Sequence, residues 1–210
     1  MTRESVTFLQ NFSVKIEFLE TIKAVDGVFF HIEYHQRRYE AVLRSYGITE
    51  KKELAAFLDA PKEGLYRCRV VYDLAGNIFC SYHPYTKRQI SRLKLLHADE
   101  LEYSKKYANR EALDALFAQR ESCDDILIVK NGLLCDTTIA NIALFDTKEW
   151  VTPKRPLLAG TTRERLLESG FLTSRDISVE DLQEYTQIAL MNAMIDFDII
   201  ADKKIEEIIC

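Results

Sequence analysis

The chain has 210 residues, of which 47% are hydrophobic, and its formal net charge at pH 7 is −5. This length accommodates one large domain or two small ones that share an interface. The excess of acidic residues argues against a nucleic-acid-binding protein, and no apolar run approaches the roughly 20 residues that a membrane-spanning helix requires. We therefore expect a soluble globular protein with neither nucleic acid nor membrane as a partner.

The cysteines and the N-terminal segment indicate the cellular compartment. The five cysteines form no CxxC pair and are odd in number, which favours reduced and mostly buried thiols. Met1–Asn11 lacks the basic-then-apolar layout of a signal peptide. Both features favour the reducing cytoplasm. The four histidines do not cluster with cysteines or carboxylates, so no metal site is expected.

Alternating apolar and polar residues indicate strands in the N-terminal half. The alternation predicts a strand from Val14 to Val25, and Asp26-Gly27 predicts a hairpin turn because both of its positions tolerate positive φ. A return strand is expected over Val28–Ile32. The other elements predicted in this half are two helices and a second hairpin: a helix over His35–Tyr46 that ends at Gly47, a helix over Lys51–Leu58, and strands over Tyr66–Tyr72 and Ile78–Tyr82.

The second half mixes helices and strands in an irregular order. It follows a basic, polar segment, Pro84–Leu93, which we interpret as the link between two subdomains of about residues 1–86 and 87–210. This irregular order is typical of the α+β class rather than of repeated βαβ units. The predicted elements are helices over Glu111–Arg120 and Thr161–Leu167, strands over Asp125–Val129, Ile139–Phe145, Gln187–Met191 and Asp198–Ala201, and a tight turn at Asn131-Gly132.

Three short segments together predict a cofactor site. They are Lys106–Arg110, Asp136–Asn141 and Leu158–Arg163. In this order they supply an amine, a carboxylate, and a helix start whose first amides and two threonine hydroxyls are free to bind an anion. Pyridoxal 5'-phosphate (PLP) needs these three groups for its aldehyde, its ring nitrogen and its phosphate.

The order and spacing of these segments resemble the class IV aminotransferase family, which includes branched-chain aminotransferases, D-amino acid aminotransferases and aminodeoxychorismate lyases. The resemblance extends over most of the chain, from about Glu20 to Asn192. It implies the D-amino acid aminotransferase-like fold of two small α/β subdomains, with PLP in the cleft between them, and a homodimer.

The resemblance assigns the catalytic lysine and the partner of the ring nitrogen. Lys106 corresponds to the lysine that binds PLP covalently, because an asparagine, Asn109, follows it at the family's spacing of three residues. Asp136 stands five residues before Asn141, where the family usually has glutamate. Its carboxylate is expected to keep the pyridine nitrogen protonated. Because aspartate is shorter than glutamate, PLP must lie nearer to this strand, or a water must bridge the gap.

Further residues are expected around the cofactor. Leu158 corresponds to the apolar residue that packs on one face of the pyridine ring, while His35 is expected to be structural. The residues expected to hold the phosphate come from three segments: Thr161 and Thr162 at a helix start, Arg38 in the first helix, and the turn Asn192-Ala193.

One departure from the family pattern concerns the substrate carboxylate. After Arg69-Val70-Val71 the family often carries an arginine–glycine pair that helps to hold this group, whereas this chain has Tyr72-Asp73-Leu74-Ala75. Four basic residues are candidate replacements: Arg67, Arg69, Lys87 and Arg88.

The resemblance favours a PLP-dependent lyase that eliminates pyruvate from 4-amino-4-deoxychorismate and gives 4-aminobenzoate for folate synthesis. Asn109-Arg110 and Asn192-Ala193 resemble the lyase versions of their motifs. The short chain is in line with an enzyme that need not alternate between two substrates. The alternatives are a class IV aminotransferase acting on branched-chain or D-amino acids, and a degenerate family member without catalysis.

Overall fold

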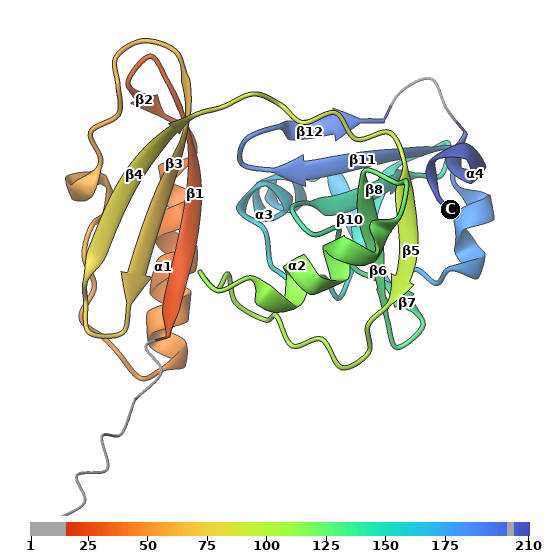
Figure 1. Ribbon diagram of the computed structural model, residues 1–210, viewed down its shortest axis with the longest axis horizontal. Helices are drawn as coiled ribbons and strands as arrows, with labels where there is room; N and C mark the ends of the chain where they lie inside the picture. Colours follow the sequence, from red (N-terminus) through yellow and green to blue (C-terminus); the bar gives the residue numbers. More distant parts are fainter. Residues whose placement is uncertain (1–15, 201–203) are drawn as a thin grey trace, which may run out of the picture.

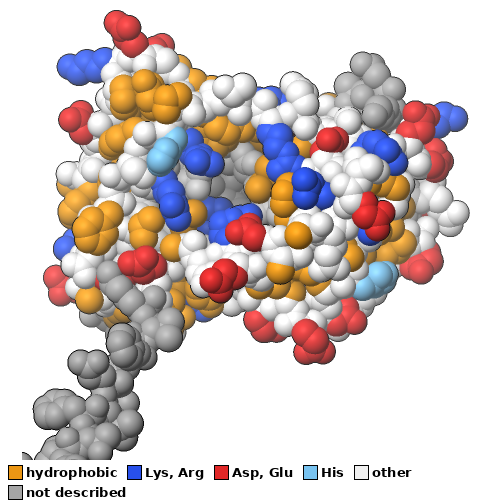
Figure 2. All heavy atoms as spheres, viewed as in Figure 1, with side chains coloured by type: hydrophobic (Ala, Val, Ile, Leu, Met, Phe, Trp, Pro, Cys, Tyr) orange, Lys and Arg blue, Asp and Glu red, His pale blue; other side chains and the backbone are white. Residues whose placement is uncertain are grey.

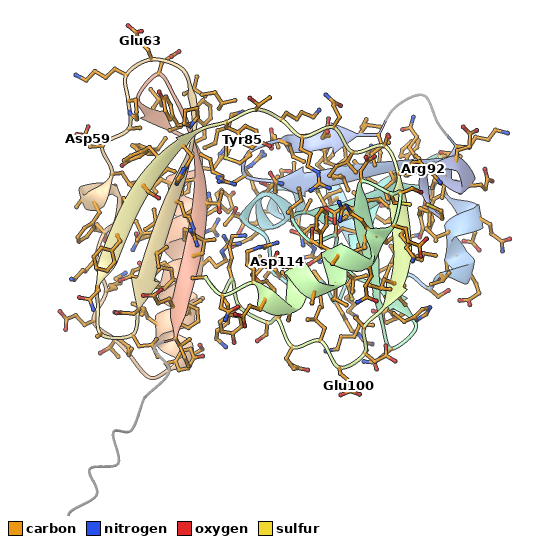
Figure 3. The ribbon with its side chains drawn as sticks, in the orientation of Figure 1. Asp59, Glu63, Tyr85, Arg92, Glu100 and Asp114 are labelled. Carbon is orange, nitrogen blue, oxygen red and sulfur yellow. The ribbon has the colours of Figure 1, made fainter. Side chains whose placement is uncertain are left out.

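The computed structural model describes residues 16–200 and 204–210, and in these ranges the chain forms two lobes joined by one extended segment (Figure 1). Tyr85 lies where this segment leaves the N-terminal lobe (Figure 3). The segment Met1–Asn11, the expected start of the first strand at Val14 and the expected end of the last strand at Ala201 lie outside the described residues. No helix within the described ranges is long and apolar enough to cross a membrane.

The N-terminal lobe is an antiparallel sheet with one helix against it. The strand order is β2-β1-β3-β4, and α1 (Ile32–Ser45) lies along the sheet. Phe18 and Ile22 of β1 are buried in one cluster with Tyr39 of α1, because every second residue of a strand points to the same face. The strands are β1 (Glu17–Val25), β2 (Val28–Phe29), β3 (Leu65–Asp73) and β4 (Ile78–Pro84).

The two predicted hairpins are confirmed, but the first return strand is shorter than expected. β2 ends at Phe29 instead of continuing to Ile32. His31 adopts a left-handed backbone conformation with a φ of 55°, and α1 begins directly after it, three residues before the predicted start. The left-handed conformation of His31 therefore ends the return strand early, and α1 starts earlier than predicted.

The helix predicted over Lys51–Leu58 is wrong. The segment forms only a 3-10 turn, η1 (Leu54–Phe57), between extended residues. The Gln36 side chain of α1 accepts a hydrogen bond from the Leu54 amide at 2.8 Å and donates one to the Lys52 carbonyl at 3.0 Å. These bonds satisfy backbone groups that a helix would otherwise pair internally.

The C-terminal lobe contains two sheets, of order β10-β9-β8-β11-β12 and β5-β6-β7. Ile126–Val129 of β6 is fully buried, as expected for a strand that is covered on both faces. The strands are β5 (Leu93–His97), β6 (Asp125–Lys130), β7 (Leu133–Leu134), β8 (Asn141–Phe145), β9 (Trp150–Pro153), β10 (Leu172–Arg175), β11 (Gln187–Asn192) and β12 (Asp196–Ile199). The helical elements are α2 (Glu111–Phe117), η2 (Ala118–Arg120), α3 (Thr161–Glu168), η3 (Glu180–Glu184) and α4 (Ile205–Ile208).

Strands β5, β9 and β10 were not expected from the sequence. β5 lies where the predicted link ends, and it pairs in parallel with β6. Its five residues alternate between apolar and polar only from Leu93 to Leu95, which is too short to distinguish a strand from a loop or a helix. β9 ends at Pro153, a residue that is disfavoured within strands. The predicted α+β class is nevertheless confirmed, because mixed sheets and helices occur in irregular order.

The two lobes meet along two lines of contact. On one side, the Leu19 amide of β1 donates a hydrogen bond to the Lys106 carbonyl at 2.8 Å. On the other side, α1 lies beside α3, and Arg37 Nη1 donates to Glu168 Oε1 at 2.7 Å. Because the two lobes are held together at both of these places, residues of the N-terminal lobe and of the C-terminal lobe can face one cavity between them.

Candidate active site

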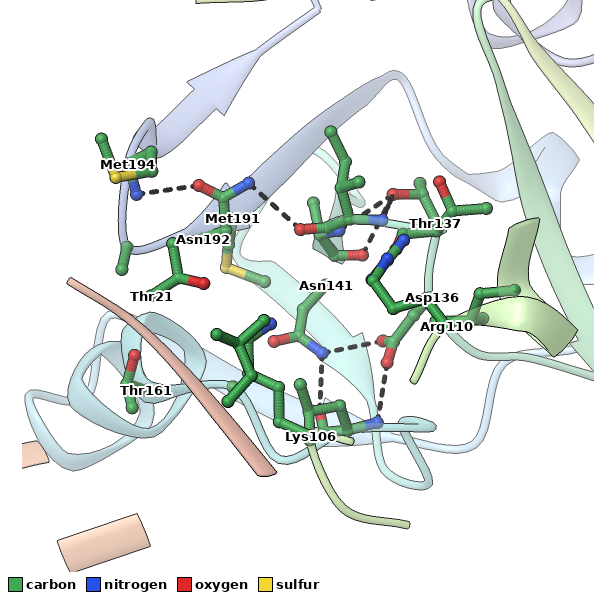
Figure 4. A pocket seen from close by; sticks show the side chains of 18 of the residues that line it. Thr21, Lys106, Arg110, Asp136, Thr137, Asn141, Thr161, Met191, Asn192 and Met194 are labelled. Carbon is green, nitrogen blue, oxygen red and sulfur yellow. Dashed lines mark hydrogen bonds between the residues drawn. The ribbon is translucent and has the colours of Figure 1, made fainter. Parts of the chain in front are cut away.

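A cavity of about 440 Å³ is lined by residues of both lobes. Figure 2 shows a hollow between the lobes that is surrounded by Lys and Arg side chains, and Figure 4 shows the cavity from close by. Thr162 is buried in the first turn of α3, outside the cavity wall. The other residues predicted for the cofactor all line the cavity: Arg38, Lys106, Asp136, Asn141, Leu158, Thr161, Asn192 and Ala193.

Lys106 presents its amine to this cavity from the segment that pairs with β1. Burial and the positive charge of Arg38 lower the pKa of Lys106 to about 7, against the opposing effects of Glu20 and Asp136. A large fraction of the amine is therefore neutral near pH 7. A neutral amine can attack a carbonyl group or accept a proton, whereas an ammonium can do neither.

Asp136 is held by two hydrogen bonds at the back of the cavity. Asn141 Nδ2 donates to Asp136 Oδ1 at 2.8 Å, and the Leu158 amide donates to Oδ2 at 2.9 Å (Figure 4). Burial raises the pKa of Asp136 to about 6, and these two bonds oppose the rise. Both oxygens of the carboxyl group are thus fixed in place.

Gly160 is required for the close approach of Asn141. Asn141 Nδ2 also donates to the Leu158 carbonyl at 2.9 Å, so the amide ties β8 to the loop before α3. A Cβ atom on Gly160 would overlap Asn141 Oδ1, although the φ of −75° at Gly160 is open to any residue. The glycine therefore serves to avoid a clash rather than to allow an unusual backbone conformation.

Arg38 reaches the cavity from a buried ion cluster in the N-terminal lobe. Its Nε and Nη2 atoms donate to the two oxygens of Glu20 at 2.8 and 2.5 Å, and Nη1 donates to the Ala159 carbonyl at 3.3 Å. Although burial alone would raise it, the pKa of Glu20 falls to about 2, because Arg38 and His35 stabilise the carboxylate. Glu20 therefore stays charged and fixes the plane of the guanidinium.

His35 lies behind Glu20, outside the cavity wall. Its Nδ1 atom is 2.7 Å from Glu20 Oε2, and burial lowers its pKa, so the ring is neutral. Nδ1 must then carry the proton that it donates to the carboxylate. Among the described residues, the buried Nε2 atom has no hydrogen-bond partner. This position agrees with the structural role expected for His35.

The N-terminus of α3 and the turn after β11 form one end of the cavity. Gly160 is the N-cap of α3, and Thr161 opens the helix. Asn192 Oδ1 accepts hydrogen bonds from the amides of Met194 and Ile195 at 2.9 and 3.1 Å, which closes the turn. Unpaired first-turn amides and a helix N-terminus favour a bound anion.

The structure separates the four candidate residues for a substrate carboxylate. Arg67 and Arg69 of β3 line the cavity. Neither has an ion pair within the described part of the chain. Lys87 instead pairs with Asp198 at 2.5 Å, and the Arg88 guanidinium lies 4.9 Å from the centre of the Phe117 ring. Only the first two are therefore placed to bind a ligand.

Several polar residues of the cavity wall were assigned no binding role from the sequence. Arg110 lines the cavity while its Nη2 atom donates to the Thr138 carbonyl at 2.9 Å. His83 of β4 also lines the cavity, directly across from Arg67 in the β3–β4 register. The predicted hairpin could have indicated His83, because residues opposite each other on paired strands share a face and Arg67 was already a candidate. Among the described residues, the wall thus combines several basic groups with one carboxylate, that of Asp136.

Lys106→Met should change how stability depends on pH. Between about pH 7 and the ordinary lysine value of 10.5, the folded wild-type protein holds a neutral amine while the unfolded chain remains protonated. The unfolded state then binds more protons, so stability rises with pH in this window. We expect the variant to lose that rise. Urea unfolding of the cofactor-free protein at several pH values measures it, with Lys105→Met as the control. Parallel pH profiles for wild type and Lys106→Met would contradict the assignment.

Gly160→Ala should disturb the bonds between Asp136, Asn141 and Leu158. We expect a loss of about 1–3 kcal/mol in the free energy of unfolding, because the methyl group forces Asn141 to move. In the double variant Gly160→Ala/Asn141→Ala the clash is absent, so its cost should be smaller than the sum of the single costs. Urea unfolding measures all three, and additive costs would show that the clash is not the cause.

Comparison with known proteins identifies the family of this chain. Residues 17–200 match the family described as Amino-transferase class IV. A Haemophilus influenzae protein, named only "Uncharacterized protein", is 38% identical over 181 residues, which are 83% of this chain and 96% of that protein. A crystal structure of "a putative 4-amino-4-deoxychorismate lyase" from Haemophilus somnus is 35% identical with a TM-score of 0.78, covering 85% of this chain and 96% of the other.

A more distant structure shares the fold. It is "a hypothetical aminotransferase from Mycobacterium tuberculosis" in its PLP-bound form, with 19% identity and a TM-score of 0.72 over 87% of this chain and 79% of the other. The expected D-amino acid aminotransferase-like fold is confirmed. With this fold, and with the family's sequence pattern over residues 17–200, the chain belongs to the class IV aminotransferases, whose members are typically PLP enzymes.

Proposed function

We propose that this protein is a PLP-dependent 4-amino-4-deoxychorismate lyase that releases pyruvate and leaves 4-aminobenzoate. The observation that carries the proposal is the position of Arg67 and Arg69 in the same cavity as the neutral amine of Lys106. Neither arginine pairs with an acidic side chain among the described residues. The proposed substrate bears two carboxylates, and planar guanidinium groups suit them. The 35% identity to the Haemophilus somnus protein also supports this choice over the other reactions of the family.

The residues of the cavity fit PLP. Lys106 would hold its aldehyde, Asp136 its ring nitrogen and Leu158 one face of its ring. The phosphate would lie at the start of α3, held by three kinds of group: the Thr161 hydroxyl with the first-turn amides, the guanidinium of Arg38, and the turn Asn192-Ala193. When bound, PLP supplies a sink for the electrons left on the substrate carbon.

Lys106 would act as the base. Its Nζ atom, neutral near pH 7, would take the proton from the carbon that bears the substrate amine. A positioned base of this kind contributes about 10²–10⁴-fold to the rate. Arg67 and Arg69 would orient the two carboxylates. The C–O bond on the neighbouring carbon would then break, enolpyruvate would leave and take up a proton to become pyruvate, and the ring would become aromatic. The homodimer implied by the family resemblance stays a prediction.

Product analysis tests the reaction. The full chain, loaded with PLP, is incubated with chorismate, glutamine and an aminodeoxychorismate synthase. We expect 4-aminobenzoate and pyruvate in equal amounts, and neither with Lys106→Ala. Borohydride reduction followed by peptide mapping should place PLP on Lys106. Transfer of an amino group from a branched-chain or D-amino acid to a 2-oxo acid, without 4-aminobenzoate, would show the aminotransferase alternative instead. The absence of both products and of the adduct would indicate a non-catalytic family member.

Arg67→Gln and Arg69→Gln should each raise KM for the substrate by about 10–100-fold, because each removes a charge-assisted hydrogen bond to a carboxylate. PLP affinity should remain the same, since neither residue is assigned to the cofactor. Arg155→Gln is the matched control, because Arg155 is 72% exposed and pairs with Asp176 away from the cavity. Steady-state kinetics with and without added salt measure the effect. An unchanged KM in both variants would show that Arg67 and Arg69 do not bind the substrate.

A further inference from the structure

The two arginines of the cavity wall occupy different positions along β3. Arg67 and Arg69 are two residues apart, so both point to the sheet face that borders the cavity, about 7 Å from each other along the strand. We propose that they bind different carboxylates of the substrate: Arg69 binds that of the enolpyruvyl group, and Arg67, together with His83 of β4, binds the one on the ring. This inference rests on the proposed function, and it adds His83 to the residues that select the substrate.

The pairing of the Lys106 segment with β1 defines a reference row on this face of the sheet. The Leu19 amide donates to the Lys106 carbonyl at 2.8 Å, next to an antiparallel bridge between the two segments. Leu19 is in turn opposite Val71 of β3. Lys106, Leu19 and Val71 therefore lie side by side across the sheet, and the first two line the cavity.

The strand register places the two arginines at increasing distance from this row. Arg69 is opposite Thr21, and Arg67 is opposite Lys23. On β1 these partners lie two and four residues beyond Leu19. Each step of two residues spans about 7 Å. Arg67 is therefore the arginine farther from the row that carries the amine.

His83 lies beside Arg67 on the edge strand β4. The two residues are opposite each other in the β3–β4 register, and both are exposed and line the cavity. Ser81 Oγ is 3.1 Å from His83 Nε2. When this hydroxyl donates, the proton of the neutral ring resides on Nδ1, for which the described residues provide no hydrogen-bond partner. Nδ1 is then free to donate to a carboxylate that Arg67 also binds.

Acidic side chains do not compete for these donors within the described wall. Its one carboxylate, that of Asp136, is held by Asn141 and the Leu158 amide. Glu20 follows Leu19 on β1, so its side chain points to the opposite face of the sheet, towards α1. A ligand that bears carboxylates can therefore supply the missing partners of the two guanidinium groups.

The proposed substrate carries its two carboxylates in the same order. The ring carboxylate is attached across the ring from the amine, whereas the enolpyruvyl ether is attached to the carbon beside the amine. With the amine at Lys106, the rigid ring holds its own carboxylate at the greater distance, where Arg67 and His83 lie. The enolpyruvyl carboxylate stays nearer, at Arg69. After the reaction, 4-aminobenzoate retains only the first carboxylate and pyruvate only the second.

Binding of the two products tests this assignment without catalysis. Calorimetric titration of the PLP-loaded full chain compares 4-aminobenzoate with aniline, which lacks the carboxylate, and with pyruvate. We expect wild type to bind 4-aminobenzoate about 10–100-fold more tightly than aniline, because charge-assisted hydrogen bonds hold the carboxylate. Arg67→Gln should lose most of this preference, and His83→Gln should reduce it about 3–10-fold. Arg69→Gln should retain the preference and weaken pyruvate binding about 10-fold.

His97→Gln is the matched control, because His97 is exposed at the end of β5 and lies outside the cavity wall. Equal losses of 4-aminobenzoate affinity in Arg67→Gln and Arg69→Gln would overturn the assignment. Equal wild-type affinities for 4-aminobenzoate and aniline, or unchanged affinities in both His83→Gln and His83→Ala, would do the same. If the product assay forms 4-aminobenzoate, these results reject the assignment alone, whereas the absence of 4-aminobenzoate from that assay rejects the reaction and this inference with it.

Discussion

The cavity depends on the backbone pairing between the Lys106 segment and β1. Besides the bond from Leu19 to Lys106, the Ala108 amide donates to the Glu17 carbonyl at 2.8 Å, so this segment extends the N-terminal sheet although it belongs to the other half of the chain. The amine of Lys106 is therefore fixed relative to the N-terminal lobe, while Asp136 is fixed in the C-terminal lobe. Any ligand that contacts both must bind across the junction.

The same junction determines the charge of the amine. Arg38 would repel an ammonium on Lys106, and Glu20 reduces this effect because it holds Arg38 through two hydrogen bonds. Without Glu20, a buried guanidinium would face the cavity uncompensated, at a large cost in free energy. The cluster therefore allows a strong cation to line the cavity while the neighbouring amine still gives up its proton near neutral pH.

The order of the motifs predicted which residues line the cavity better than the apolar pattern predicted the individual strands around it. Lys106, Asp136 and Thr161 line one cavity, as the resemblance to the family's motifs implied, whereas β5 carries no clear local signal and pairs with β6 and Ile209, which lie far along the chain. Among the candidate arginines, the sequence could not separate Arg67 from Arg88. That difference arises from strand direction and lobe packing, which are tertiary properties.

Asp136 and Gly160 both depend on the close approach of the loop before α3 to strand β8. A short carboxylate reaches the Leu158 amide only if the loop before α3 approaches β8 closely, and Asn141 occupies the space that a Cβ at Gly160 would need. The same approach places the first turn of α3 at the cavity wall, next to Arg38, which donates to the Ala159 carbonyl. The position of this loop thus lets the short Asp136 side chain reach the Leu158 amide, and the same loop leads directly into the first turn of α3 at the cavity wall.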